Sequence, residues 1–195
     1  MFRLGITGGI GSGKSFVCSI LEKFGVPVYY ADEEARRLMN TRVDLKRAIK
    51  VVFGEEIYQD GELDRQEMGR RIFGRPDMLD KINRMVHPVV REDFFKWSES
   101  WENVPYVIEE AAILFESGAA SEMDASVLIY APKELRIERV MARDGLSRSE
   151  VEKRINMQMD EEEKKRLADR VILNDEKKLL LPQLVALHED IKSRI

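Results

Sequence analysis

Residues 8–15 of the chain read GGIGSGKS and match the pattern G-x-x-x-x-G-K-[ST]. An apolar run at 2–7 precedes this segment and an amphipathic stretch follows it, so we expect a strand, a loop and a helix in that order. The glycines let backbone N–H groups approach an anion without interference from a Cβ atom, at a helix end whose dipole favours negative charge. These features predict a phosphate-binding P-loop and argue against a glycine-rich turn without a ligand.

The two polar residues that end the loop have separate predicted roles. Lys14 would reach the β- and γ-phosphates of a bound nucleotide as a point charge. The Ser15 hydroxyl would complete the shell of a Mg²⁺ ion whose other ligands are largely water and phosphate oxygens. The loop therefore predicts a nucleotide and a metal ion that bind together.

The composition narrows the class of protein. A chain of 195 residues with 44% hydrophobic residues suits one α/β domain with room for an insertion. A net charge of −4 without a basic stripe argues against nucleic acid as a partner. The single cysteine, Cys18, lies among apolar residues, so we expect a buried side chain and a reducing compartment. No apolar run approaches the ~18 residues of a membrane span and no leader-like segment is evident, so we expect a cytoplasmic protein without a membrane partner.

Beyond the P-loop helix, which should end at Gly25, strand and helix patterns alternate. Apolar segments at 26–30, 104–108, 126–131 and 171–173 predict further strands of an α/β fold. Pro132 suits the first position of a helix that should end at Gly145. An amphipathic helix should close the chain.

From about residue 41 to 101 the pattern is helical, apart from a possible turn at 59–62. The longest helix, 78–97, contains His87-Pro88, and the proline should kink or divide it. His87 invites a catalytic interpretation, but a histidine beside a helix-breaking proline is more often a structural hydrogen-bonding residue. His188 lies on a charged helix, and we expect it to be solvated.

Three acids follow or end predicted strands. Ligands of open α/β sheets bind beyond the carboxyl ends of the strands, so Asp32 can face the P-loop. Asp32 can equally cap the helix that follows, and both roles stay open. Of Glu109 and Glu110, alternation lets only one point into the site, and we favour Glu110 as the acid that orients the metal's water shell.

Arg136, Arg139 and Arg143 recur at i, i+3 and i+7, which predicts one guanidinium stripe. Phosphate oxygens are its natural target, and the alternative is a solvated face paired with Glu134 and Glu138. Ser147 and Glu150 then form a capping box that should open a long helix. We interpret the charged run at 160–166 within that helix as solvated surface.

Five separated pieces of the chain together resemble the dephospho-coenzyme A kinase family. They are residues 7–15, Ala31-Asp32 with Ala35-Arg36, His87-Pro88, Leu114-Phe115-Glu116, and Arg139 and 143–147 with Arg154, Gln158 and Asn174-Asp175. Four positions depart from the family's usual residues. Tyr30 replaces an acid, Ala112 a proline, Phe16 a threonine and Glu176 a glycine, and the first of these puts any metal role of that acid in doubt.

This resemblance implies a P-loop NTPase fold with a mostly parallel sheet flanked by helices. The core would comprise about 1–31, 102–138 and 168–195, with an inserted helical acceptor-binding section at about 32–101 and a helical lid at about 139–167. It implies ATP-dependent phosphorylation of the ribose 3′-hydroxyl of dephospho-CoA, the last step of coenzyme A biosynthesis, with Mg²⁺ as the metal.

The resemblance also implies roles for individual residues. Asp32 would accept the hydroxyl proton, Arg139 would contact the transferring phosphate, and Asn174 would lie by the adenine. Catalysis would thus involve Asp32, Lys14 and Arg139. The other residues expected at ATP are Gly11, Ser12, Gly13, Ser15 and Phe16, with Ser15 at the metal. Those expected at the acceptor are His87, Leu114, Phe115 and Glu116.

Three alternatives to this function can be distinguished. Another P-loop nucleotide or metabolite kinase would accept a different hydroxyl. A GTP-dependent switch would need a guanine-reading N-K-x-D stretch, which the chain does not contain. A P-loop scaffold that binds ATP only to stabilise an assembly would turn over no small acceptor.

Overall fold

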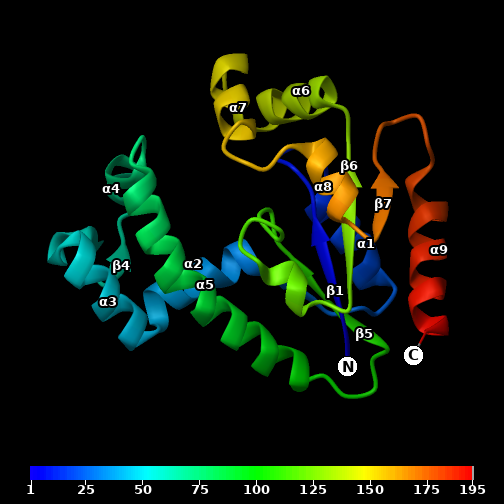
Figure 1. Cartoon of the computed structure of the whole chain (residues 1–195), viewed down its shortest axis with the longest axis horizontal. Coiled ribbons are helices and arrows are strands. Elements are labelled where there is room, and N and C mark those ends of the chain that lie inside the picture. Colours follow the sequence, from blue (N-terminus) through cyan, green and yellow to red (C-terminus); the bar gives the residue numbers. More distant parts are fainter. Residues whose placement is uncertain (195) are drawn as a thin grey trace. The chain divides into compact units, whose positions relative to one another are not determined.

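The structure is a computed structural model that describes residues 1–194 (Figure 1). The chain divides into two compact units. We call Met1–Tyr30 with Ser98–Ile195 the sheet unit, and Ala31–Trp97 the helical unit. Within the described residues, no helix has both the length and the apolar character that crossing a membrane requires.

The sheet unit is built on five strands in the order β2-β5-β1-β6-β7, and all its strand pairs are parallel. The strands are β1 (Phe2–Thr7), β2 (Val28–Tyr30), β5 (Tyr106–Glu110), β6 (Ala125–Tyr130) and β7 (Arg170–Leu173). The predicted mostly parallel α/β sheet is confirmed, although β2 begins two residues later than expected. Because β1 pairs with both β5 and β6, it lies at the centre of the sheet, and the P-loop leaves its carboxyl end.

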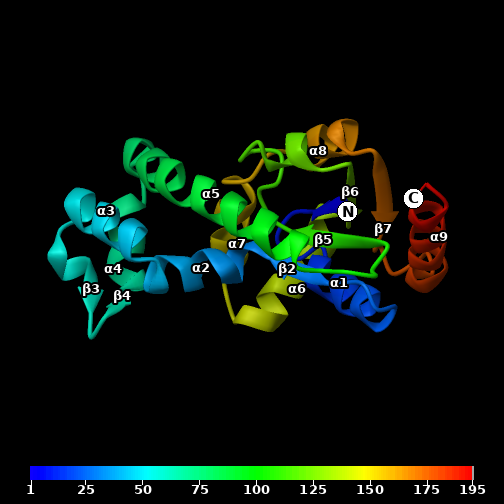
Figure 2. The same ribbon diagram turned by 90° about the horizontal axis from the view of Figure 1, so that it is seen from below.

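The helices of the sheet unit are α1 (Lys14–Lys23), α6 (Lys133–Asp144), α7 (Arg148–Ile155), α8 (Glu161–Leu167) and α9 (Leu180–Ser193), with a short 3₁₀ helix η2 (Ala119–Glu122). Helices α1, α8 and α9 contact the strands, while α7 packs against α6. The main core joins Val17 and Leu21 of α1 and Leu184 of α9 to inward residues of the strands. Figure 2 shows α9 beside β7, and Figure 1 agrees. Burial of these apolar faces is the main force that holds the helices to the sheet.

The predicted long helix from Ser147 is in fact two helices. Ser147 and Glu150 form the expected capping box of α7, which ends at Ile155. Asp160 then caps α8, because its side chain accepts hydrogen bonds from the backbone N–H groups of Glu162 and Glu163. Residues 156–160 therefore form a linker, which we call the α7–α8 linker.

The ends of α6 agree with the prediction to within one residue. Pro132 is the residue before the first helical one, so it caps α6 and does not occupy its first turn. Gly145 ends α6 in a left-handed conformation, with φ 67°, as the pattern indicated.

The helical unit contains α2 (Ala31–Thr41), α3 (Val43–Phe53), a 3₁₀ turn η1 (Glu55–Ile57), β3 (Tyr58–Gln59), β4 (Glu62–Leu63), α4 (Arg65–Ile72) and all but the last two residues of α5 (Pro76–Glu99). The predicted turn at 59–62 joins β3 and β4 in a hairpin. Asp60 and Gly61 both have positive φ, at 49° and 88°, as a two-residue hairpin turn requires.

Of the two outcomes that the sequence left open at His87-Pro88, a kink or a division of the helix, the division is wrong. The helix runs through Pro88 without a break. Pro88 lies on its exposed side, where water can satisfy the carbonyl that loses a hydrogen bond to the missing N–H. Val86, Val90 and Phe94 are buried on both sides of the proline, and their packing keeps the helix whole.

Candidate active site

The P-loop runs from the end of β1 to the start of α1, and its glycines are required by close neighbours. At Gly13, whose φ is 92°, a Cβ atom would lie 2.3 Å from Nδ2 of Asn174. At Gly11, whose φ is 81°, a Cβ atom would lie 2.5 Å from the carbonyl oxygen of Arg136. Both the backbone conformation and the packing therefore exclude larger residues, and the loop presents its N–H groups at the start of α1.

Lys14 folds back over this loop. Its Nζ donates a hydrogen bond to the carbonyl oxygen of Gly8 at 2.8 Å and lies 3.7 Å from a carboxylate oxygen of Glu110. Ser15 and Phe16, in the first turn of α1, are exposed. Phosphate oxygens can replace the Gly8 carbonyl as the acceptor for Lys14 without any change in the fold, since only the end of a flexible side chain has to move.

Of the two glutamates that end β5, Glu110 lies at the P-loop. Both side chains are buried, but Glu110 contacts Lys14. In the sheet Glu110 lies level with Ile6 on one side and with Tyr30 on the other. The residue that we favoured from the alternation of β5 is thus the one beside the loop lysine.

Cys18 is fully buried, as expected. Burial raises the pKa of its thiol, and the nearby charge of Glu110 acts in the same direction. The thiol is therefore protonated at neutral pH and packs as a small apolar group.

The three arginines of α6 do not form one stripe. Arg139 donates to the carbonyl oxygens of Gly11 and Asn174, at 3.4 and 3.2 Å, and pairs with Glu176 at 3.0 Å. Arg136 is 3% exposed and lies over the P-loop, with Nη1 only 2.1 Å from where a Cβ of Gly9 would stand. Arg143 is exposed and pairs with Asp144 at 2.7 Å. The prediction of a single arginine stripe is therefore wrong for Arg143, because the Arg143 side chain pairs with the adjacent Asp144.

The alternative was that these arginines pair with Glu134 and Glu138, and it is wrong for Glu134. Glu134 pairs with Arg148, which lies on α7. Two of the three α6 arginines thus contact the P-loop, and α6 is fixed to α7 by other charges.

The turn after β7 is tied to the P-loop. Asn174 donates from Nδ2 to the carbonyl oxygen of Ser12 at 2.8 Å, and its own carbonyl accepts from Arg139. Glu176 has φ 62°, in the left-handed region that favours glycine. This conformation accounts for the glycine that the resembling family often has at this position.

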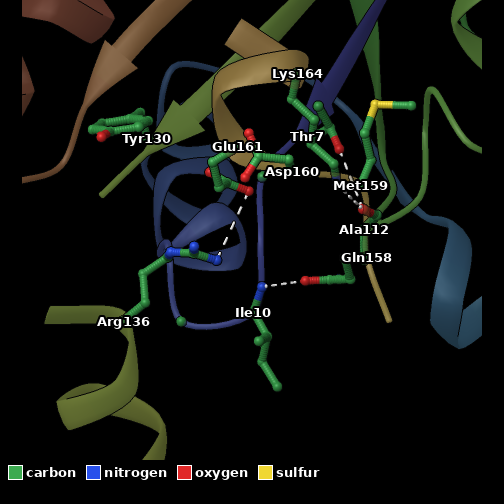
Figure 3. Close-up of polar contacts among 12 residues, drawn as sticks. Thr7, Ile10, Ala112, Tyr130, Arg136, Gln158, Met159, Asp160, Glu161 and Lys164 are labelled. Atoms are coloured by element: carbon green, nitrogen blue, oxygen red, sulfur yellow. Dashed lines mark hydrogen bonds and ion pairs between the residues drawn. The ribbon is translucent and has the colours of Figure 1, made fainter. Parts of the chain in front are cut away.

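The α7–α8 linker and the start of α8 also contact the P-loop, which the sequence did not predict (Figure 3). Gln158 accepts a hydrogen bond from the backbone N–H of Ile10 at 2.9 Å. Glu161 lies 3.8 Å from Arg136, and both side chains are buried. A pocket of about 480 Å³ lies between the end of β6, α6 and this segment. Its lining includes Tyr130, Lys133, Arg136, Gln158, Glu161 and Glu162.

The interpretation of 160–166 as solvated surface is wrong at Glu161 and Lys164. Burial raises the pKa of the Glu161 carboxyl, and the charges of Arg136 and Lys164 and the N–H of Gly9 oppose that shift. Lys164 has no solvent exposure. Asp160 is the sequence signal that could have helped here. A cap at Asp160 starts a new helix, so residues 161–166 need not share the solvent-facing side of the single long helix that had been predicted.

The acceptor-binding residues predicted in the sheet unit have different environments. Leu114 is fully buried, and its Cδ2 would lie 2.6 Å from a Cβ on Gly5 of β1. Phe115 is partly exposed, and the Glu116 carboxylate pairs with Lys164 at 2.9 Å. The side chain of Leu114 thus packs in the core, while Phe115 and Glu116 keep some access to solvent.

The remaining predicted site residues lie in the helical unit. Asp32 is exposed and is the second residue of α2, so it does not cap that helix, which begins directly after β2. A carboxylate in the first turn still interacts favourably with the helix dipole. His87 is half-buried in α5, and burial and the charge of Arg91 lower the pKa of its imidazole. The catalytic and binding roles of both residues stay predictions.

His188 is not simply solvated, contrary to the expectation. Its Nδ1 shares a hydrogen bond of 2.9 Å with the hydroxyl of Tyr106, and its ring centroid lies 5.4 Å from that of Phe24. The contact joins α9 to β5 and gives His188 a structural role.

A metal ion at this loop would depend on few protein ligands. The described residues contain no group of three or more His, Cys, Asp or Glu side chains that could hold a metal ion. The exposed Ser15 hydroxyl at the start of α1 suits an ion held mainly by phosphate and water, as Mg²⁺ is with nucleotides.

Comparison with known proteins gives a consistent result over the whole chain. A family model described as dephospho-CoA kinase matches residues 2–179. A dephospho-CoA kinase of Bacteroides fragilis (strain YCH46) is 42% identical over 185 residues, which cover 95% of this chain and 90% of the relative. That of Porphyromonas gingivalis (strain W83) is 38% identical over 195 residues, which cover 100% and 96%.

Solved structures agree with the sequence matches. The dephospho-CoA kinase of Campylobacter jejuni has a TM-score of 0.71 at 25% identity and covers 98% of this chain and 97% of its own. The protein TT1252 of Thermus thermophilus has a TM-score of 0.82 at 36% identity, with coverage of 100% and 97%. Shikimate kinase of Bacteroides thetaiotaomicron, at 15% identity, 97% coverage of each chain and a TM-score of 0.54, shares the fold alone.

Proposed function

The chain belongs to the dephospho-CoA kinase family, and on that premise we propose how its own residues carry out phosphoryl transfer. It is an ATP-dependent phosphotransferase that acts on dephospho-CoA, and another metabolite kinase is not favoured. We propose the ribose 3′-hydroxyl as the acceptor atom. The observation that carries the proposal is a family match that spans the P-loop and every separated motif as far as Asn174.

The donor ATP binds at the P-loop in this proposal. Backbone N–H groups of Gly11 to Ser15 hold its phosphates at the start of α1, and Lys14 leaves the Gly8 carbonyl for the β- and γ-phosphates. Asn174, fixed against Ser12, lies by the adenine. The Ser15 hydroxyl is the protein ligand of Mg²⁺, which neutralises phosphate charge when bound, and Phe16 follows it in the nucleotide site.

The transfer itself is in line. The acceptor oxygen forms a bond to the γ-phosphorus, the bond from that phosphorus to the β,γ-bridging oxygen breaks, and ADP leaves. Asp32 takes the proton of the hydroxyl, and Arg139 stabilises the charge that develops on the transferring group. Positioning and charge neutralisation supply most of the rate enhancement.

The acceptor is held by His87 of α5 and by the loop with Leu114, Phe115 and Glu116 in this proposal. Leu114 supports the loop from the core, while Phe115 and Glu116 contact dephospho-CoA. A net charge of −4 and one buried cysteine support a cytoplasmic enzyme without nucleic acid or membrane as a partner.

Asp32→Asn tests the assignment of the residue that accepts the proton, with Glu33→Gln as the matched control on the same helix turn. An amide cannot accept the proton, so kcat should fall by roughly 10²-fold or more at an unchanged melting temperature. Glu33→Gln, which also removes one exposed carboxylate from α2, should leave kcat unchanged. A near-normal kcat for Asp32→Asn would remove Asp32 from the catalytic residues.

A further inference from the structure

Lys164 is buried in a place where its charge is costly. It lies within the charged run 161–166, yet its side chain has no solvent exposure. An ammonium group tolerates such burial only where it is paired and hydrogen-bonded. Both conditions are met, since Nζ donates a hydrogen bond to the carbonyl oxygen of Ala112 at 3.0 Å and forms an ion pair with Oε1 of Glu116 at 2.9 Å.

The two partners of Lys164 belong to one loop, residues 111–118, which leaves the carboxyl end of β5. Ala112 lies near the start of this loop and Glu116 near its end, so one ammonium group holds both. Leu114 anchors the middle of the loop in the core, and Phe115 is held between the two contacts. Carboxyl ends of parallel strands are where open α/β sheets bind their ligands.

The segment that carries Lys164 also reaches the P-loop. Gln158 accepts from the backbone N–H of Ile10 at 2.9 Å. The next residue, Met159, donates its backbone N–H to the same Oε1 of Glu116 at 2.9 Å. At the other end of the loop, the Thr7 hydroxyl lies 3.5 Å from the Ala112 carbonyl, directly before the P-loop (Figure 3). Residues 158–164 thus connect the loop after β5 to the nucleotide-binding loop.

We propose that Lys164 is a positioning residue for the acceptor, which acts by holding the loop from Ala112 to Glu116 at a fixed distance from the P-loop. The inference rests on the proposed function, in which Phe115 and Glu116 bind dephospho-CoA. Lys164 touches neither substrate. Lys164 sets the position of the acceptor-binding side chains, so its loss weakens the binding of dephospho-CoA far more than the binding of ATP.

Lys164→Met tests this role, with Lys165→Met as the matched control. Lys165 is the next residue of α8, is 44% exposed, lies 3.8 Å from Glu162 and has its Nζ 5.0 Å from the centroid of the Tyr130 ring. Lys164→Met should raise the KM for dephospho-CoA by about tenfold or more and change the KM for ATP by less than about twofold. Lys165→Met should change neither. Melting temperatures are recorded for both variants.

A second measurement needs no substrate. Hydrogen exchange of the amides at 112–118 should be faster in Lys164→Met than in the wild type, and unchanged in Lys165→Met. If Lys164→Met does not fold, the double variant Glu116→Gln with Lys164→Met removes both charges and leaves neither one buried alone. For the double variant the decisive readout is exchange of this loop, which should be faster than in the wild type, because Glu116 contacts dephospho-CoA in the proposed function and its loss would raise that KM by itself.

Several results would overturn the inference. A lower melting temperature with an unchanged KM for dephospho-CoA would make Lys164 a structural residue only. Equal increases of both KM values, or unchanged exchange at 112–118, would exclude a selective effect through the loop. If neither the wild type nor Lys165→Met turned over dephospho-CoA, the proposed function itself would be wrong. The exchange data would then show separately whether Lys164 orders the loop at 112–118.

Discussion

Arg139 is held at the edge of the P-loop by contacts of unequal strength. Two of its hydrogen bonds go to backbone carbonyls of Gly11 and Asn174, and the third goes to Glu176, whose side chain is 65% exposed. An exposed ion pair is worth only about 0.2–1 kcal/mol. Arg139 can therefore exchange Glu176 for a phosphate oxygen while the carbonyls keep its guanidinium in place.

We expect Arg139→Ala to lower kcat by roughly 10²-fold or more and to change the KM for ATP far less, because its charge matters most in the transition state. Arg143→Ala is the control, since that arginine is exposed and pairs with Asp144. Steady-state kinetics on both variants decide the point. An unchanged kcat with a raised KM would make Arg139 a residue of ground-state binding.

His188 should make stability depend on pH. Burial and the charge of Lys192 lower the pKa of its imidazole from 6.5, while Glu189 acts against them. Below about 6.5 the unfolded chain therefore binds a proton that the folded chain does not, so the free energy of unfolding falls as the pH drops towards the lowered pKa. His188→Gln can still bond to Tyr106 but cannot titrate.

Melting temperatures at about pH 7.5 and about pH 5.5 test this expectation. The melting temperature should fall less between about pH 7.5 and about pH 5.5 for His188→Gln than for the wild type. His87 and the acidic residues contribute equally to this fall in both proteins. Identical drops would show that the folded His188 titrates normally.

For single residues, the sequence predicts a role correctly when that role depends on neighbours in the chain. The order of strand, loop and helix around the P-loop and the burial of Cys18 depend on residues close by in the chain, and both predictions are confirmed. Lys164 and His188 were misjudged because their partners are far away in sequence, Lys164 with Ala112 at 52 residues and His188 with Tyr106 at 82. Charge patterns cannot show which charged side chain a distant loop will cover.

Among the elements, α7 owes its start to a reciprocal cap. Ser147 accepts from the N–H of Glu150, and Glu150 accepts from the N–H of Ser147. Ser147→Ala should lower the free energy of unfolding by about 1 kcal/mol. Ser147→Thr should lower it much less, because threonine can also cap a helix. Chemical denaturation followed by circular dichroism measures both. Equal stability of Ser147→Ala and the wild type would mean that the cap adds nothing.

Elements with strong local signals were predicted well, and those set by tertiary context were not. The strand before the P-loop follows from an apolar run, and the ends of α6 follow from Pro132 and Gly145. The turn of the hairpin at 58–63 was predicted, but its two strands were missed because two-residue strands carry almost no periodic signal. The continuation of α5 through Pro88 depends on packing of Val86 and Val90, which propensity does not include.

For the molecule as a whole, the proposed residues are shared by the two units. Lys14, Arg139 and Asn174 belong to the sheet unit, while Asp32 and His87 belong to the helical unit. The family resemblance assigned the reaction to all of them, and the P-loop alone would have fitted many kinases. The overall reaction is therefore what a direct experiment has to establish.

The most direct test is to incubate the purified protein with Mg²⁺, ATP and dephospho-CoA and to identify the product by mass spectrometry and ³¹P NMR. We expect CoA with the new phosphate on the ribose 3′-oxygen, equimolar ADP, and no comparable transfer to adenosine or AMP. Lys14→Ala should remain folded, with a melting temperature lowered by the loss of its 3.7 Å ion pair with the buried Glu110, and should form no CoA, because the loop lysine holds the phosphates. ATP hydrolysis without CoA, or CoA formation by Lys14→Ala at the wild-type rate, would contradict the account.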